Sequence, residues 1–367
     1  MQNSKKILWF TWKDRKNPLA GGAELVNEEL AKRLVKDGKE VIFLVAGFKG
    51  GKREEKIDGY KIIRVGNKWT VYWLAYRYYK KYLQYWPDLV IEEINTIPFL
   101  TKYYVKQRNI LLIYQLCRQI WFYEIFFPLN LFGYLIEPIY LWLLRDRKVI
   151  TESESTKTDL TRFGFKPQNI KIIPIGIEFK PVDDLKKIEK YPNPTLISLG
   201  SIRAMKQTDH IIKAFELAKK EIPNLKLLIA GDMSGNYGLK IKKMIHDSQY
   251  TNSIHYLGKI DKNKKIEIMQ KAHLLLVTSV KEGWCIVVTE ANSQGTPAVT
   301  YNADGLRDSV KHDQTGLICI KNTIEKLSQN IVELFKDKQK YKKISTNAWL
   351  WSKEFNFDFS YKTFIAK

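Results

Sequence analysis

The chain has 367 residues, 45% of them hydrophobic, which is too long for one typical core and suits two α/β domains. Its formal net charge of +22 favours nucleic acid, anionic lipid or phosphorylated molecules as partners, but no helix-turn-helix, zinc-finger or RNP-like pattern supports specific nucleic-acid binding. Cys117, Cys285 and Cys319 lie far apart, which excludes a disulfide scaffold and indicates reduced thiols in the cytoplasm. The apolar run that begins at Ile7 is too short for a signal peptide and predicts a first strand.

The first half of the chain alternates short apolar strands with helices. Strand 7–12 leads through a loop that ends in Gly21 and Gly22 into a helix that ends at Gly38. A strand, two glycines and a helix N-terminus bring backbone amides close to a ligand, which suits a phosphate, although a tight turn explains the glycines equally well. Further strands are expected at 41–45, 61–65, 89–92, 110–113, 148–151 and 170–174, with a loop at 47–56.

Two segments of the first half are rich in aromatic residues. The predicted helix 69–86 interleaves Trp and Tyr with Lys and Arg. The segment 120–144 is the most apolar of the chain, but its two glutamates and two prolines make it unsuitable as a membrane span. Such a composition fits core packing, and it also fits a surface that faces lipid. Both interpretations stay open.

The second half begins after a linker at 178–194, which is charged, contains proline and follows no period. Strands are expected at 195–199, 226–230, 254–257, 274–277 and 297–301, with helices at 209–220, 239–247 and 262–272 between them. This alternation predicts a doubly wound parallel sheet, which binds ligands at the carboxyl ends of its strands. The loops expected at that edge are 200–206, 231–238, 258–260 and 282–287.

The stretch 277–316 carries the clearest chemical signal. Gly283 permits a sharp turn and a close ligand, and the amides of Trp284–Val287 at a helix N-terminus suit an anion. Glu282 and Glu290 can each accept hydrogen bonds from a polyol. A diphosphate between two sugars is the ligand that this layout predicts, whereas a solvated charge explains either glutamate better when it is considered alone.

The whole string resembles the nucleotide-sugar loop of the retaining glycosyltransferases of family 4. It reads E-G, six residues, E, then G-T-P and D-G-L, and G-G-A-E at 21–24 resembles the first loop of the same family. The resemblance spans nearly the whole chain and implies the GT-B fold, in which two Rossmann-like α/β domains face each other across a cleft. The implied domains are 1–177 and 195–349, with a tail at 350–367 that packs back on the first domain.

The resemblance also implies roles for residues. Lys206, Glu282 and Arg203 are the expected catalytic residues, Arg203 replacing an arginine that the family usually places where this chain has Ser201. Glu290 would hold the ribose, and a lysine such as Lys206 suits a phosphate. The other expected donor-binding residues are Gly21, Gly22, Gly200, Ser201, Gly231, Gly258, Lys259, Ile260, Gly283, Trp284, Cys285, Ile286 and Val287. Candidate acceptor or sugar contacts are Asn95, Tyr114, Gln115 and Arg118, since Tyr114 stands where the family often has histidine.

The implied reaction is the transfer of a hexose, with retention of configuration, from a nucleotide-diphosphate sugar to a glycan or a lipid-linked acceptor. A UDP-sugar is favoured, with GDP-mannose next. No D-x-D pair is present, so we expect no metal and no cofactor besides the co-substrate, and cationic side chains and helix N-termini would stabilise the leaving diphosphate. No carboxylate is an obvious nucleophile, which favours front-face substitution. The expected location is the cytoplasm, with the anionic inner face of the membrane as a further partner.

Two other classes of function stay open. A nucleotide-sugar epimerase on the same architecture would need acid and base residues in the cleft, and all five histidines, the first of which is His210, lie in the C-terminal half. A non-catalytic module that binds sugar or anionic lipid would fit the charge and the aromatic residues. Turnover of a sugar nucleotide distinguishes these possibilities.

Overall fold

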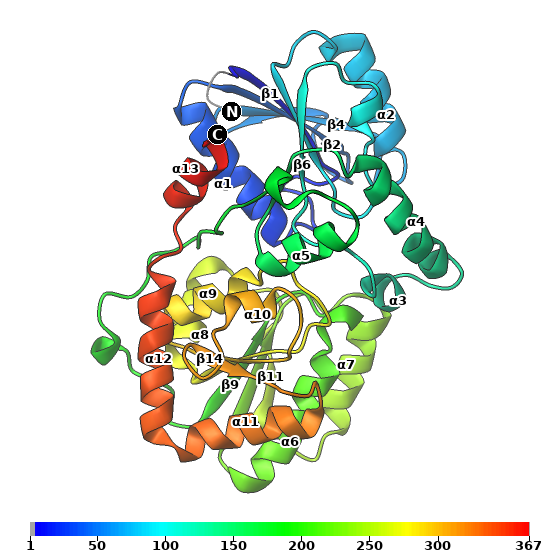
Figure 1. Ribbon diagram of the computed structural model, residues 1–367. Helices are drawn as coiled ribbons and strands as arrows, with labels where there is room; N and C mark the ends of the chain where they lie inside the picture. The colour runs from blue at the N-terminus through cyan, green and yellow to red at the C-terminus, as the bar shows by residue number, and fades with distance from the viewer. Residues whose placement is uncertain (1–3, 367) are drawn as a thin grey trace. The chain divides into compact units, whose positions relative to one another are not determined.

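The computed structural model describes residues 4–366, which form two compact units (Figure 1). Unit 1 comprises the first 118 residues with Leu131–Gly176 and Asn356–Lys367, and unit 2 comprises Gln119–Asn130 and Ile177–Phe355. Residues 1–3 and 367, which the predicted first domain and tail include, lie outside the described residues. Each unit contains one parallel or mostly parallel sheet with helices, which confirms the predicted fold class.

Unit 1 is built on an eight-stranded sheet in the order β3-β4-β2-β1-β5-β6-β7-β8. Neighbouring strands are parallel except β3, which lies antiparallel to β4 at the edge and begins within the segment 47–56 that was predicted as a loop. The central strands are buried almost throughout, as expected for parallel strands that are covered on both faces. The strands are β1 Lys6–Phe10, β2 Glu40–Ala46, β3 Glu54–Ile57, β4 Tyr60–Val65, β5 Leu89–Glu93, β6 Arg108–Leu112, β7 Val149–Thr151 and β8 Ile170–Ile172.

The helices of unit 1 are α1 Gly22–Lys36, α2 Val71–Tyr78, α4 Leu129–Leu144 from Leu131 onwards, α5 Glu154–Arg162 and α13 Phe357–Ile365. The predicted helix 69–86 is therefore shorter, and one π-helical turn, Tyr79–Leu83, follows α2. Helix α13 returns to α1 at the end of the chain. There Arg33 binds Asp358 at 2.8 Å, and the rings of Trp9 and Phe364 stack with centroids 6.0 Å apart.

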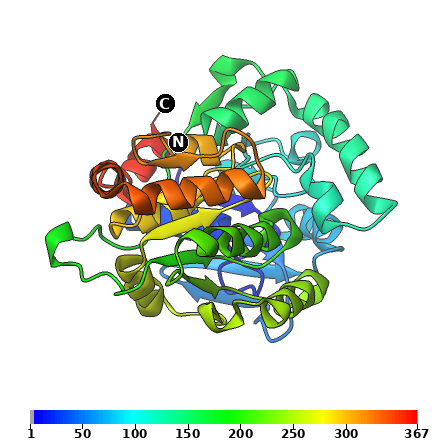
Figure 2. The ribbon, with the colours of Figure 1, turned by 90° about the horizontal axis from the view of Figure 1, so that it is seen from below.

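Unit 2 contains a six-stranded, wholly parallel sheet in the order β11-β10-β9-β12-β13-β14. The strands are β9 Thr195–Leu199, β10 Lys226–Ala230, β11 Ile254–Tyr256, β12 Leu274–Val277, β13 Ala298–Thr300 and β14 Gly316–Ile318. The helices are α3 Ile120–Glu124, α6 Thr208–Glu221, α7 Gly235–Asp247, α8 Lys262–Lys271, α9 Ile286–Ser293, α10 Leu306–Ser309, α11 Ile324–Lys336 and α12 Lys338–Ser352. Helix α6 packs against α7 and α11 (Figure 2), and α9 packs against α8 and α12.

The boundaries of the units differ from the predicted ones. Gln119–Asn130, predicted as part of the first domain, belongs to unit 2. Residues 178–194 also belong to unit 2 and are not an independent linker, because the Lys190 ammonium donates to three oxygen atoms of that unit at 2.8–2.9 Å. The tail joins unit 1 only from Asn356 onwards.

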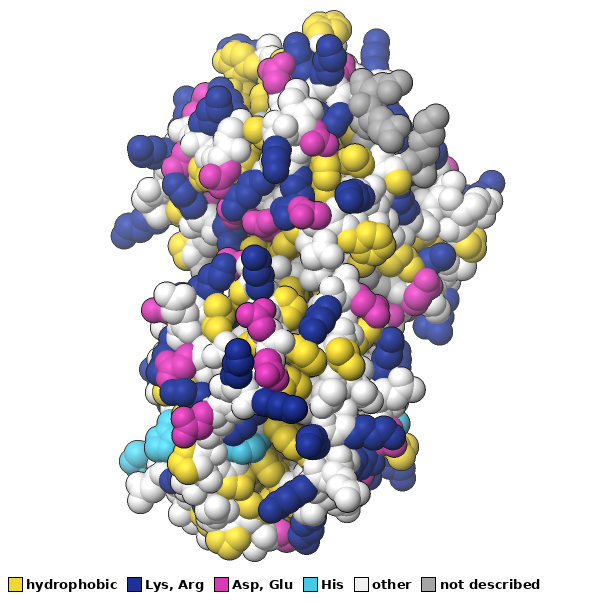
Figure 3. Space-filling model, turned by 90° about the vertical axis from the view of Figure 1, so that its left-hand side faces the viewer, with side chains coloured by type: hydrophobic (Ala, Val, Ile, Leu, Met, Phe, Trp, Pro, Cys, Tyr) yellow, Lys and Arg dark blue, Asp and Glu magenta, His cyan; other side chains and the backbone are white. Residues whose placement is uncertain are grey.

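The surface reflects the composition. On the face that Figure 3 shows, Lys and Arg side chains are spread over the whole view, with Asp and Glu among them. Within residues 4–366, none of the helices is both long enough and apolar enough to cross a bilayer.

Candidate functional site

The segments that follow β9 and β12 meet in the middle of the unit 2 sheet. These strands are neighbours, and the chain leads from β9 towards one edge of the sheet and from β12 towards the other. At such a reversal of strand order, open α/β sheets bind ligands beyond the carboxyl ends of the strands. Val280 N donates to Met205 O at 2.9 Å, and Thr278 Oγ1 donates to Lys206 O at 2.7 Å. The two segments are therefore held against each other.

Lys206 and Glu282, two of the predicted catalytic residues, form an ion pair at this position. Lys206 ends the 3-10 turn Ala204–Lys206, and Gln207 then takes a left-handed conformation with φ of 49°. The Lys206 side chain is 27% exposed and that of Glu282 is 11% exposed, so the pair is half-buried and still reaches the surface. The fold thus joins two opposite charges that lie 76 positions apart in the sequence.

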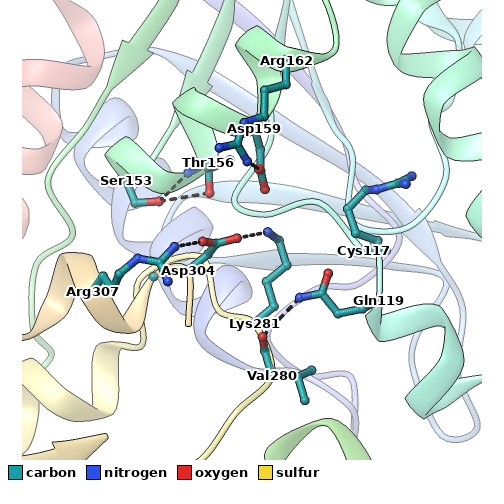
Figure 4. Close-up of polar contacts among 12 residues, drawn as sticks. Cys117, Gln119, Ser153, Thr156, Asp159, Arg162, Val280, Lys281, Asp304 and Arg307 are labelled. Atoms are coloured by element: carbon teal, nitrogen blue, oxygen red, sulfur yellow. Dashed lines mark hydrogen bonds and ion pairs between the residues drawn. The ribbon is translucent and has the colours of Figure 1, made fainter. Parts of the chain in front are cut away.

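The loop after β13 supports Glu282 from behind. Glu282 N donates to Asp304 O at 3.0 Å, and Gly305, with φ of 75°, approaches so closely that a Cβ there would lie 2.4 Å from Glu282 O. Lys281 Nζ lies 2.5 Å from an Asp304 oxygen, and Arg307 pairs with the same carboxylate (Figure 4). Although burial opposes it, these cations hold the pKa of Asp304 below its usual value. Sequence reasoning missed Lys281 and Arg307, because nothing local links them to Asp304.

Glu290 lies on α9 and is only 1% exposed. Its Oε2 lies 2.5 Å from Lys265 Nζ on α8, so the buried carboxylate has a cationic partner. A buried charge requires such a partner. Sequence reasoning missed Lys265, which is one of four lysines in α8 and has no local mark that distinguishes it.

Trp284 and Cys285 precede α9, and both side chains are buried. The Trp284 ring packs against Phe355, with centroids 5.3 Å apart. Cys285 takes a left-handed conformation with φ of 78°, and burial raises the pKa of its thiol. Helix α9 begins at Ile286, later than the predicted N-terminus at Trp284. Because their side chains are buried, Trp284 and Cys285 can contact a donor only through their backbone groups. Ile286 and Val287 are half-buried, so part of each residue reaches the surface.

Three predicted donor-binding glycines lie at the ends of neighbouring strands: Gly200 after β9, Gly231 after β10 and Gly258 after β11. Gly231 N donates to Gly258 O at 2.8 Å, and a Cβ on Gly231 would lie 1.8 Å from Gly200 O. Gly231 also has φ of 149°, so this position needs glycine for both space and conformation. The other predicted residues of this edge are exposed or half-buried: Ser201, Lys259 and Ile260.

Arg203 has a different partner from Lys206. Its exposed guanidinium lies 3.8 Å from a carboxylate oxygen of Glu124 in α3, and Met205 N donates to the other oxygen of Glu124 at 3.2 Å. An exposed ion pair of this kind contributes little to stability. The geometry therefore favours Lys206 over Arg203 as the cation beside Glu282.

In unit 1, Gly21 and Gly22 form the start of α1, as predicted from the sequence. Gly21 N donates to Glu24 Oε2 at 2.6 Å, so this amide is engaged within the chain. Glu24 is buried, and its other oxygen lies 3.3 Å from Lys13 Nζ. The acidic side chain in the first turn also suits the positive end of the helix dipole.

Tyr114, predicted to contact a sugar, is buried in unit 1. Its hydroxyl donates to Asn27 Oδ1 at 2.7 Å, and Asn27 Nδ2 donates to Glu93 at 2.5 Å. Burial and the negative charge of Glu24 raise the pKa of Glu93 to about 7. The structure thus gives Tyr114 a place in a buried polar cluster with Glu93. Sequence reasoning missed this glutamate, although a charged residue at the end of an apolar strand was a signal.

The remaining candidates of unit 1 surround the segment after β6. Arg118 has φ of 39°, stacks over the Tyr134 ring at 4.1 Å and lies 3.7 Å from Glu137. Asn95 O accepts a weak hydrogen bond from the Cys117 thiol. Gln115 is half-buried. Arg118 is therefore held by α4, and contacts of Asn95 and Gln115 with an acceptor stay predictions.

In residues 4–366, no three His, Cys, Asp or Glu side chains group in a way that could hold a metal ion. No disulfide joins the cysteines of this range.

Family models match most of the chain. The model for glycosyl transferases group 1 matches residues 183–351, and the model for glycosyltransferase family 4 matches residues 20–180. Among curated proteins, poly(glycerol-phosphate) alpha-glucosyltransferase from Bacillus subtilis is 35% identical over 217 residues, which cover 58% of this chain and 29% of that protein. The chain spans 29% to 60% of the length of the first curated relatives that it matches.

Solved structures share the fold. Sucrose-phosphate synthase from Thermosynechococcus elongatus superposes with a TM-score of 0.79 at 17% identity and covers 98% of this chain and 97% of its own. The Anabaena protein Alr3699/HepE in complex with UDP-glucose superposes with a TM-score of 0.72 at 17% identity, over 97% of each chain. At this identity the likeness shows the fold alone, which is the GT-B fold.

Proposed function

We propose that this chain, which belongs to the glycosyltransferases of family 4, transfers a hexose from a nucleotide-diphosphate sugar to a glycan or a lipid-linked acceptor. The observation that carries the proposal is the Lys206–Glu282 ion pair at the reversal of strand order in unit 2, with Glu290 on the helix that follows. This is the part of an α/β sheet that binds nucleotides.

Lys206 supplies the positive charge for the donor diphosphate. In the structure its ammonium is paired with Glu282, so the cation is already oriented before a ligand arrives. A preorganised charge stabilises negative charge in a transition state without the cost of reorganisation. As the bond between the sugar and the diphosphate breaks, negative charge grows on the diphosphate. Lys206 therefore stabilises the transition state more than the ground state.

Glu282 and Glu290 orient the two sugars of the donor. We assign the hexose hydroxyls to Glu282, whose position is set by Asp304 and Gly305. We assign the ribose hydroxyls to Glu290, whose carboxylate is fixed by Lys265. A charged acceptor makes hydrogen bonds to hydroxyl donors that are stronger than neutral ones. Gly200 and Gly258, where a Cβ would meet no heavy atom within 4 Å, leave space for the nucleotide beside the strand ends, and Gly231 lets the loops after β9 and β10 pack closely.

The proposed reaction retains the configuration of the anomeric carbon. The acceptor oxygen attacks the anomeric carbon from the face that the diphosphate leaves. The bond from that carbon to the phosphate oxygen breaks, and the departing diphosphate takes the proton of the acceptor hydroxyl. Lys206 and backbone amides neutralise the diphosphate, so we propose that the reaction needs no divalent metal.

UDP-glucose is the first donor to test, and GDP-mannose is the second. The name of the B. subtilis relative reports alpha-glucosyl transfer to poly(glycerol phosphate), and the Anabaena structure contains UDP-glucose. A phosphate-rich or lipid-linked acceptor also suits a chain with a net charge of +22. We propose the anionic inner face of the membrane as a further partner, which would make this a peripheral cytoplasmic enzyme.

A thermal-shift screen against UDP, GDP, UDP-glucose and GDP-mannose, in buffer with EDTA, tests the donor. A ligand that binds only the native state raises the melting temperature, so one nucleotide family is expected to stabilise the protein. NMR of the anomeric proton during turnover then tests retention. Binding without hydrolysis or transfer would instead favour a non-catalytic binding module, and stabilisation by no nucleotide would contradict the proposed donor.

A further inference from the structure

The outer face of α4 in unit 1 is apolar and exposed. Phe132, Leu135, Ile139 and Trp142 follow one another at spacings of three and four residues and thus share one face of the helix. Their side chains are 63%, 58%, 57% and 57% exposed. Four large apolar side chains on one helix face are rarely all so exposed in a soluble protein. Figure 1 shows α4 running along the outside of unit 1.

The opposite face of α4 is fixed in the core. Tyr140, Leu141 and Leu144 are buried, and the Tyr140 hydroxyl donates to Thr96 O at 2.7 Å. The one charged residue of the helix, Glu137, is 1% exposed and accepts hydrogen bonds from two backbone amides at 2.7 Å. The orientation of the helix is therefore set by the core, and the apolar stripe cannot turn inwards without breaking these bonds.

Basic side chains lie over exposed aromatic rings beside this stripe. The Arg145 guanidinium lies 4.1 Å from the Trp142 ring centroid, and Lys102 Nζ lies 5.8 Å from that of Tyr103. Lys102 Nζ also donates to Leu143 O at 2.8 Å, so Tyr103 lies beside the end of α4. Aromatic rings with cations next to them are typical of side chains at the boundary between lipid and water.

A second set of such pairs lies near α2. Lys68 Nζ lies 4.8 Å from the ring of Trp69, and Lys81 Nζ lies 5.1 Å from that of Tyr82, with Trp69 72% and Tyr82 57% exposed. Trp73, one turn after Trp69, is also exposed. Unit 1 thus carries two aromatic and basic surfaces, and only the one on α4 has a continuous apolar stripe.

We propose that the α4 stripe, Phe132, Leu135, Ile139 and Trp142, inserts into the surface of an anionic lipid bilayer. The charge supports this occupant: the rim carries Arg145, Lys102 and the ion-pair partner of Lys102, Asp146, which leaves one net positive charge there, and the whole chain has a net charge of +22, which attracts anionic lipid. A second copy of the chain would bring the same positive charge to the contact and would be repelled. A helix of 16 residues suits an interfacial position rather than a span.

This inference deepens the membrane contact of the proposed function, in which the acceptor is carried on lipid. It is nevertheless tested separately, because vesicle binding is measured without a sugar nucleotide. A failure to bind vesicles removes the membrane surface and leaves donor binding unaffected.

The test is flotation of the full chain with vesicles of phosphatidylcholine alone and with vesicles that also contain phosphatidylglycerol. The variant Phe132→Ser/Ile139→Ser is compared with Leu239→Ser/Ile320→Ser, which alters two exposed apolar residues of unit 2. The wild type is expected to float with the anionic vesicles. Burial of each large apolar side chain contributes roughly a tenfold gain in affinity, so the α4 variant should bind at least about tenfold more weakly, while the control should bind as the wild type does.

Two further measurements keep the outcome decisive. Because the substituted side chains are exposed, both variants should melt at the wild-type temperature. Equal vesicle binding by the α4 variant and the wild type would overturn the proposal. So would a dimer in light scattering that the α4 variant alone converts to a monomer, since a second copy would then cover the stripe.

Discussion

Gly305→Ala is the substitution that links the geometry of the site most directly to its function. A methyl group at this position would lie 2.4 Å from Glu282 O and 2.8 Å from Glu282 Cβ. Contacts shorter than 3.0 Å are essentially absent for real Cβ atoms, so the two chain segments must separate by about 0.6 Å to reach that limit. The φ of 75° adds strain for any residue with a Cβ.

The expected magnitude has two parts. The left-handed conformation costs about 1–2 kcal/mol for a residue other than glycine. Overpacking of a tight contact typically adds about 1–3 kcal/mol. We therefore expect Gly305→Ala to lower the free energy of unfolding by about 2–5 kcal/mol. We also expect weaker donor binding, because a displacement of about 0.6 Å moves Glu282 away from its ligand.

Gly38→Ala is the matched control. Gly38, at the end of α1 in unit 1, has φ of 74°, but a Cβ there would meet no heavy atom within 4 Å. It should therefore lose only the conformational part, about 1–2 kcal/mol, and bind the donor as the wild type does. Urea denaturation gives the free energies of unfolding, and calorimetry with the nucleotide sugar gives the affinities. Equal losses of stability in both variants, or undiminished donor affinity in Gly305→Ala, would refute the position assigned to Glu282.

Three other outcomes follow from the described contacts. Glu290→Gln should weaken UDP binding about tenfold in calorimetry but leave the affinity for 2′-deoxy-UDP close to that of the wild type, and an equal loss for both ligands would refute the ribose assignment. Arg203 is paired with Glu124, so Arg203→Met should retain donor affinity within about threefold. A loss of affinity as large as that of a Lys206 variant would contradict the preference for Lys206 over Arg203 as the cation that binds the donor. Glu93→Gln should flatten the pH dependence of stability. In the wild type the pKa of Glu93 is raised to about 7, so the native state holds a proton that the unfolded state loses above about pH 4.5, and the free energy of unfolding should fall by up to roughly 3 kcal/mol between those values. Urea titrations at pH 5 and 8 measure this, and an equal slope in Glu93→Gln would refute it.

The sequence allowed the prediction of most strands, though not of β3 and β14, and of the spacing around Glu282. The apolar runs before Gly200 and Glu282 are followed by glycine or charge, and this local pattern is enough to place both residues at strand ends. Lys206 and Glu282 were predicted to belong to one site, but no ion pair between them was predicted. Its physical basis is the position of β9 next to β12, a tertiary property that no local pattern contains.

Other features could not be predicted for the same reason. Lys265, Lys281 and Arg307 have partners that are identified only by the packing of helices and loops. Tyr114 was predicted to contact a sugar because it stands where the family often has histidine, but its side chain is buried in unit 1, where Asn27 on α1 accepts a hydrogen bond from its hydroxyl. The segment 119–130 was assigned to the first domain by its position in the chain, whereas the contacts of Glu124 place it in unit 2.

The most direct test of the central claim is isothermal titration calorimetry of Lys206→Met with the nucleoside diphosphate that the thermal-shift screen selects, in buffer with EDTA. Loss of one charge-assisted contact costs about 1.5–3 kcal/mol, so the affinity should fall by roughly ten- to more than a hundredfold. Lys336→Met, which removes an exposed lysine paired with Glu221, should bind as the wild type does. An affinity of Lys206→Met equal to that of the wild type would contradict the claim that Lys206 holds the diphosphate.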